Sequence, residues 1–248
     1  MINYIRADLY RIFKDKKFIA TLALYVALFM GFVYMGQKNF QVAMDVVNFV
    51  NILVRLSFLY VGILIFYLVY GMELKAKTSH QVLARGMGRW KLILSKLIVL
   101  VTMLGFMFIG LFLTVYMASI FLGVALDGEA MKVLTYNILT EFVKSLVYFS
   151  LTSIFVFKSE NPVMGMSAYV LLASGIIGSL MGIILNSSLV VRVIGDQSRF
   201  LVAALSNNFL QVLMTGKGAM EVLPALGLYL VLANLLAMVL YRKRELEF

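Results

Sequence analysis

The sequence predicts an all-α membrane protein with six transmembrane helices. Apolar residues make up 62% of its 248 residues, and the mean hydropathy is +0.97, both far above the values of soluble globular domains. Only two prolines occur, so long helices meet few interruptions. The net charge of +10 does not indicate nucleic-acid binding, because the Lys and Arg residues flank apolar runs instead of gathering in one domain.

Six apolar runs are long enough to cross a hydrocarbon core, which takes about 20 helical residues. The chain is expected to form a single transmembrane domain over residues 1–248. Its predicted spans are residues 18–36, 52–72, 97–124, 138–157, 163–185 and 222–241. The fourth span is the least apolar, and Glu141 and Lys144 are placed three residues apart at its outer end, where Lys144 can snorkel.

Residues 200–216 form a further apolar segment that is short and interrupted by polar side chains. A seventh crossing there would move the basic residues Arg242, Lys243 and Arg244 to the outer side. We therefore expect a re-entrant or interfacial hairpin before the last span, buried against protein where its backbone can be satisfied.

The distribution of basic residues predicts the orientation. With six spans and both termini inside, most of the 22 Lys and Arg residues fall in cytoplasmic segments, while the 12 acidic residues divide evenly. An excess of basic residues alone is what the positive-inside rule requires. The prediction is a multi-pass membrane protein with both termini in the cytoplasm.

The segment before the first span has the periodicity of an amphipathic helix. Ile2, Ile5, Leu9 and Ile12 recur at helical spacing with charged residues between them. Such a helix would lie along the inner leaflet. A solvated basic leader is the alternative interpretation.

The loop between the second and third spans, residues 73–96, holds six Lys or Arg residues against one acid. Thr78 and Gln81 match a capping box, and Gly86 suits the position just after a helix end, which predicts a helix of about two turns. It would expose Val82 and Leu83 within a polar rim.

The same loop is predicted to return to the membrane through Arg89, Trp90 and Lys91. The indole of Trp90 suits the membrane interface. An ordinary basic loop is the alternative to a docking helix.

The fifth span contains a stripe of small residues at four-residue spacing, Ser174, Gly178 and Gly182. Small residues let transmembrane helices approach closely. Packing within one subunit and packing between subunits are both compatible with this pattern.

Motifs of catalysis and metal binding are missing from the sequence. Thr215 to Gly218 resembles the end of a P-loop but lacks the rest, no HExxH or Gly-x-Ser-x-Gly occurs, and there is no cysteine. The only histidine is His80, and central span positions carry no charged residue. We therefore expect no enzyme activity, no metal site and no cofactor bound by this chain.

This layout resembles the permease subunits of ABC-2 type ABC transporters, especially small bacterial ones that handle peptides or antibiotics. Four segments carry the resemblance across the whole chain: the amphipathic leader ending in Phe13–Phe18, the loop Glu73–Lys96, the hairpin before the last span, and the basic terminus Tyr241–Phe248. The resemblance implies that the leader is an elbow helix.

The resemblance also implies that the loop helix is a coupling helix that docks on a separate ABC ATPase subunit, which would bind ATP and Mg. The implied docking residues are Gln81, Val82, Leu83, Arg85, Gly86, Met87 and Arg89. A second permease, of the same or a related chain, would pair with this one. The candidate residues for that pairing or for helix packing are Tyr25, Phe29, Phe32, Ser174, Gly178 and Gly182.

The implied function is export of amphipathic peptides, antimicrobials or lipophilic compounds across a bacterial cell membrane. ATP would drive movement of the spans through the coupling helix. The alternative is a non-transporting six-helix membrane protein with an immunity, sensor or scaffold role, which needs no ATPase.

Overall fold

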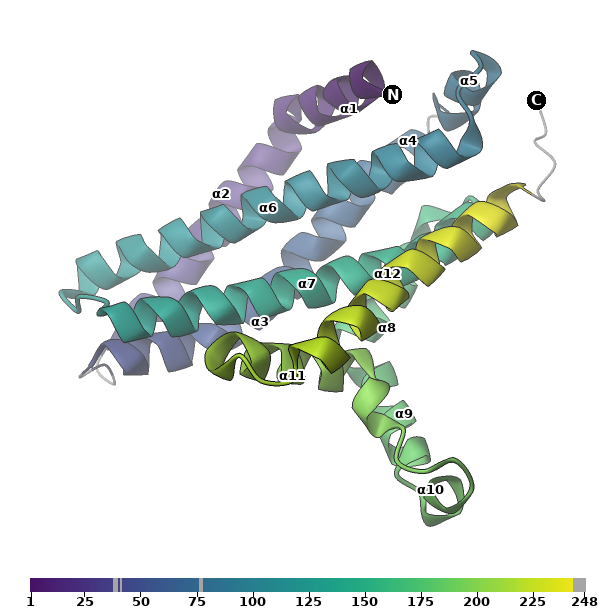
Figure 1. Ribbon diagram of the computed structural model, residues 1–248. Helices are drawn as coiled ribbons and strands as arrows, with labels where there is room; N and C mark the ends of the chain where they lie inside the picture. The colour runs from purple at the N-terminus through teal and green to yellow at the C-terminus, as the bar shows by residue number, and fades with distance from the viewer. Residues whose placement is uncertain (38–39, 41, 76–77, 243–248) are drawn as a thin grey trace.

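The computed structural model describes residues 1–37, 40, 42–75 and 78–242, and every regular element in these ranges is a helix (Figure 1). The basic terminus 243–248 and residues 76–77 of the charged loop lie outside the described residues. The first half of the chain forms α1 (Ile2–Lys14), α2 (Lys16–Met35), α3 (Ala43–Phe66), a π-helix (Tyr67–Gly71), α4 (Met72–Lys75), α5 (Thr78–Ala84) and α6 (Arg89–Leu122). The second half forms α7 (Gly128–Ser159), α8 (Pro162–Ala173), α9 (Ile176–Leu185), α10 (Ser188–Ile194), a 3₁₀-helix (Ser198–Phe200), α11 (Val202–Thr215) and α12 (Ala219–Arg242).

Five of the described helices are long and apolar enough to cross a membrane, and the bent pair α8–α9 raises the number to six if it counts as one span. The protein is therefore an all-α, multi-pass membrane protein, as the sequence predicts. The helices extend beyond several predicted spans. The span predicted over 52–72 belongs to a helical stretch from Ala43 to Leu74, and the one predicted over 138–157 to α7.

Helix α7 is the central element, packing against α3, α6, α8, α11 and α12. Its first turn is capped by Asp127, whose carboxylate accepts from the Ala130 N–H at 2.7 Å. Beside it, the rings of Phe149 and Tyr169 stack with centroids 4.4 Å apart, and the Tyr169 hydroxyl donates to the Phe58 carbonyl at 2.6 Å. These contacts join α7, α8 and α3 in one apolar core.

The predicted fifth span, 163–185, is not straight. Helix α8 ends at Ala173, α9 begins at Ile176, and their axes differ by 59°. Gly175 lies at the break with a φ of +82°, a left-handed conformation that few residues other than glycine adopt. Helices α9 and α10 consequently project from the bundle (Figure 1).

Residues 200–216, expected as a hairpin, form the 14-residue helix α11 after a short 3₁₀ turn. The helix packs on α7 and α12 and buries Leu205, Ser206 and Phe209. The Ser206 hydroxyl donates to the Ala203 carbonyl at 2.9 Å, so a polar residue is accommodated inside the packing. A single helix thus forms most of the segment for which a re-entrant or interfacial hairpin was expected.

One end of the bundle gathers segments that are far apart in the sequence. Tyr4 of α1 bonds to Glu73 of α4, and Arg89 at the start of α6 bonds to the last turn of α12. Helix α5 projects beyond this end (Figure 1). We call it the α5 end of the bundle.

Candidate functional site: a buried ion cluster at the α5 end

Four charged side chains meet where α1, α4 and α6 come together at the α5 end. Asp8, Glu73 and Lys96 are buried, and Arg11 is partly buried. The Lys96 Nζ lies 2.7 Å from Asp8 Oδ2 and also pairs with Glu73, while Arg11 pairs with Asp8 from the next turn of α1. We call these four residues the ion cluster. Its two acids and two bases balance, which is how buried charges are tolerated.

The π-helix supplies the remaining partners of the two cations. Lys96 Nζ donates to the Val69 carbonyl at 3.0 Å, and Arg11 Nη2 donates to the Leu68 carbonyl at 3.1 Å. Both carbonyls belong to the π-helix that joins α3 to α4. Short π-helical turns are often found at functional positions of helices. Helix α1 is thus attached to the ends of α3 and α6 by charge-assisted hydrogen bonds.

Tyr4 extends the ion cluster towards the start of α1. Its hydroxyl donates to Glu73 Oε1 at 2.5 Å, and its ring lies 5.3 Å from the Lys96 ammonium. Burial raises the pKa of Tyr4 above its ordinary value, and the nearby Glu73 carboxylate raises it further. The phenol therefore stays protonated and remains a hydrogen-bond donor to Glu73.

Sequence reasoning did not place these residues together, since it treated α1 and the loop 73–96 as separate segments at headgroup level. The sequence does contain a signal that Asp8 is buried. It follows Ile5 by three residues and precedes Ile12 by four, which puts it on the apolar side of α1. An acid on that side needs a buried cationic partner.

Helix α5 ends as predicted. Gly86 has a φ of +90°, its N–H donates to the Leu83 carbonyl at 2.9 Å, and the Met87 N–H donates to the Val82 carbonyl at 3.3 Å. This pair of bonds is a Schellman closure with glycine in the left-handed position. At the other end, the described part of the helix begins at Thr78, whose hydroxyl donates to the Glu73 carbonyl at 3.3 Å.

The predicted docking residues do not all face the same way. Gln81, Arg85 and Gly86 are exposed, whereas Val82, Leu83 and Met87 are half-buried against the core. Among the predicted docking residues, the exposed side chains are therefore polar and the apolar ones are turned partly inward.

Arg89, the last of the predicted docking residues, has partners inside the chain. Its Nη1 donates to the carbonyls of Tyr241 and Arg242, each at 2.7 Å, and its guanidinium lies 5.6 Å from the Tyr241 ring centroid. It thereby satisfies carbonyls at the end of α12 that have no partner within that helix. Arg89 joins α6 to α12 at the α5 end.

Two of the three aromatic residues proposed for pairing face their own chain. Tyr25 is half-buried and shares a hydrogen bond with Ser57, and Phe29 is 2% exposed. Phe32 is 54% exposed and points away from the bundle.

The small-residue stripe is divided by the bend between α8 and α9. Ser174 is exposed at the end of α8, while Gly178 and Gly182 lie on α9. A Cβ added to Gly178 would lie 3.8 Å from the Ala203 Cβ, and one added to Gly182 would lie 3.8 Å from the Leu201 Cδ1. Both glycines thus face the segment that leads into α11.

A second group of charges occurs along α7. Glu141 is 6% exposed, its Oε2 lies 2.5 Å from Lys144 Nζ, and its Oε1 lies 3.6 Å from Arg55 Nε on α3. The contact between Glu141 and Lys144 agrees with their predicted placement on one helix face. This second group links α7 to α3.

Within the described residues, no group of three or more His, Cys, Asp or Glu side chains is arranged to hold a metal ion. No protein-family model matches the chain, and no curated protein matches it in sequence. The fold therefore establishes only the general class of the protein, which is a multi-pass α-helical membrane protein.

Proposed function

We propose that this chain is the permease subunit of an ABC-2 type exporter, driven by a separate ABC ATPase that binds ATP and Mg. The supporting observation is the attachment of α5. It is a short, closed helix with exposed Gln81 and Arg85, and it sits beside an ion cluster at the ends of two long apolar helices. In this proposal the α5 end faces the cytoplasm of a bacterium, as do both termini.

Helix α5 would pass on the movement of the ATPase. In the sequence it lies between α4, which follows α3 and the π-helix, and α6, which it precedes through Gly88. The ion cluster ties α1 to both of these helices. A push on α5 would therefore move α1, α3 and α6 together, and ATP binding would bias the bundle between two arrangements.

The rest of the proposal concerns the spans and the cargo. The pair α8–α9 would count as one span and bring the total to six, α11 would be the re-entrant segment, and a second permease would complete the path. The cargo would be an amphipathic peptide, an antimicrobial or a lipophilic compound. A six-helix immunity, sensor or scaffold protein remains the competing function.

Arg85 gives the sharper test, because Leu83 is half-buried and a charge there would also disturb packing. Tagged protein is purified from its own cell membranes, and any co-purifying chain with a Walker A motif is identified and assayed for ATP hydrolysis. Arg85→Glu should abolish recovery of this ATPase, with wild-type binding weakening as salt rises. Arg192→Glu, the same change at an exposed site on α10, is the matched control. Failure to recover an ATPase with the wild type, or equal recovery with both variants, would favour the scaffold function.

A further inference from the structure

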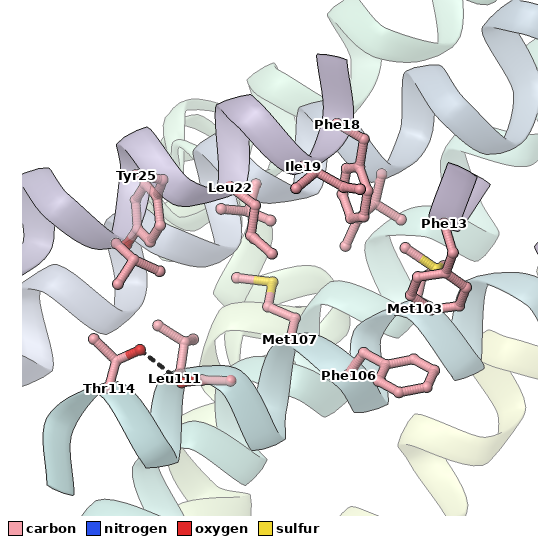
Figure 2. Close-up of a pocket in the computed structure, with 14 residues that line it drawn as sticks. Phe13, Phe18, Ile19, Leu22, Tyr25, Met103, Phe106, Met107, Leu111 and Thr114 are labelled. Atoms are coloured by element: carbon pink, nitrogen blue, oxygen red, sulfur yellow. Dashed lines mark hydrogen bonds between the residues drawn. The ribbon is translucent and has the colours of Figure 1, made fainter. Parts of the chain in front are cut away.

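An apolar cavity of about 320 Å³ lies between α1, α2, α3 and α6. Figure 2 shows Leu22 of α2 and Met107 of α6 pointing towards each other across it, with Phe13 and Phe106 together at one end. The rings of Phe13 and Phe106 are 4.9 Å apart in an edge contact, which joins α1 to α6. We call this space the elbow cavity.

The lining of the elbow cavity offers a ligand almost nothing but hydrocarbon. Its two hydroxyl-bearing side chains are already occupied, since Tyr25 bonds with Ser57 and Thr114 donates to the Gly110 carbonyl at 2.8 Å. Ile19 and Phe106 at its rim are more than half exposed, so the cavity opens on the outer surface of the bundle. An acyl chain in the bilayer can enter from that side and bury apolar surface.

A second hollow lies at the junction of α1 and α2. Its charged lining residues are Arg11, Lys14, Asp15 and Lys17, so bases exceed acids by three to one. The two spaces are neighbours along the chain, because Lys14 follows Phe13 and Lys17 precedes Phe18. Lys14 and Lys17 are exposed, while Arg11 already pairs with Asp8.

We infer that the α1–α2 junction binds an anionic phospholipid, with an acyl chain in the elbow cavity and the phosphate at Lys14 and Lys17. Charge complementarity selects this occupant, because a hydrocarbon site beside exposed lysines matches a molecule with an apolar tail and a negative head. The phosphate sits at the depth of α1, whose apolar side faces the bundle and whose lysines reach the headgroups. The site is independent of the proposed transport function.

The experiment uses tryptophan quenching by brominated lipids. The only tryptophan, Trp90, is replaced by Phe, and Phe106→Trp is introduced as a reporter at the rim of the cavity. The protein is reconstituted in phosphatidylcholine vesicles that contain either brominated phosphatidylglycerol or brominated phosphatidylcholine at equal mole fraction. Quenching of the reporter should show that the anionic lipid binds there in preference to phosphatidylcholine, on the order of fivefold for each contributing lysine. A second reporter, Phe121→Trp, on α6 and 75% exposed, should show no preference.

Lys14→Glu combined with Lys17→Glu should bring the preference at the Phe106→Trp reporter to about one, while Lys132→Glu on exposed α7 surface should leave it unchanged. In the protein that keeps both lysines, added salt should lower the preference for the anionic lipid at the reporter. This provides a second measurement if the double variant fails to insert. Equal quenching by the two lipids, or a preference that survives the double variant, would overturn the inference. Protection of the reporter from both lipids in a crosslinked dimer would assign the cavity to a second copy instead.

Discussion

Lys96→Met should strongly destabilise the junction of α1, α4 and α6. Methionine keeps an unbranched apolar stem of similar length but removes the ammonium group. That group contacts Asp8 at 2.7 Å, the Val69 carbonyl at 3.0 Å and the Glu73 carboxylate. Its loss leaves two buried carboxylates with only Arg11 and Tyr4 to compensate them.

Breaking a buried ion pair by removing one partner costs about 3–5 kcal/mol, because the remaining charge stays desolvated. For a chain of this length, a cost of that size corresponds to a fall in midpoint temperature on the order of 10 °C. Neutralising Asp8, Glu73 and Lys96 together should cost less stability than removing the Lys96 charge alone. The triple variant Asp8→Asn, Glu73→Gln, Lys96→Met should therefore recover part of the lost stability.

The assay is thermal unfolding in detergent, followed by the fraction of protein that remains monodisperse after heating. Lys91→Met is the matched control, since Lys91 lies on the same helix but is exposed. It should shift the midpoint by no more than the small effect of a surface change. If Lys96→Met unfolds at the same temperature as Lys91→Met, the ion cluster does not stabilise this end of the bundle and the reasoning fails.

Three further predictions concern glycines and use the same assay. Gly62→Ala should cost about 1–3 kcal/mol because its Cβ would overlap the Tyr169 ring, whereas Gly31→Ala, with open space around it, should be neutral or stabilising. Equal midpoints for these two variants would contradict the packing of α3 against α8. Gly86→Ala should cost about 1–2 kcal/mol and speed hydrogen exchange in α5, because its φ is +90°; unchanged exchange would argue against the closure. Gly178→Ala should leave stability and oligomeric state unchanged, because its Cβ would make an ordinary contact with α11; loss of a dimer would place this glycine between subunits.

The long helices could be predicted from the sequence because hydropathy over about 20 residues is a local signal. The predicted first span, 18–36, nearly coincides with α2, and the predicted last span, 222–241, lies within α12. The bend in the predicted fifth span was missed because Gly175, beside the stripe of small residues, carried no separate signal of a break. Its left-handed φ is a conformational property, and a glycine inside an apolar run is compatible with either a straight or a broken helix.

The end of α5 was predictable for the same local reason, since a glycine after a short helix indicates a closure within a few residues. The ion cluster was not, because Asp8 and Lys96 are joined across 88 positions of the chain. Charged residues near membrane spans ordinarily lie among headgroups, and composition does not distinguish those that pair in the interior. The partners of Arg89 were missed for a similar reason, because they are carbonyls of Tyr241 and Arg242.

The π-helix has a consequence for the direction in which Glu73 points. Successive residues of an α-helix are about 100° apart, so in an uninterrupted helix Glu73 would point about 80° away from the buried Ile65. A π-turn takes in roughly one extra residue, which turns the residues after it back by about a quarter of a turn. Glu73 then lies in line with Ile65 and reaches Lys96. The meeting of these charges therefore depends on the number of residues between them as well as on their identities. Deleting one residue from Tyr67–Gly71 should let this stretch close as a regular α-helix with seven steps between Ile65 and the glutamate, about 20° from alignment, so Glu73 should still reach Lys96 and the bundle should lose much less stability than in Lys96→Met.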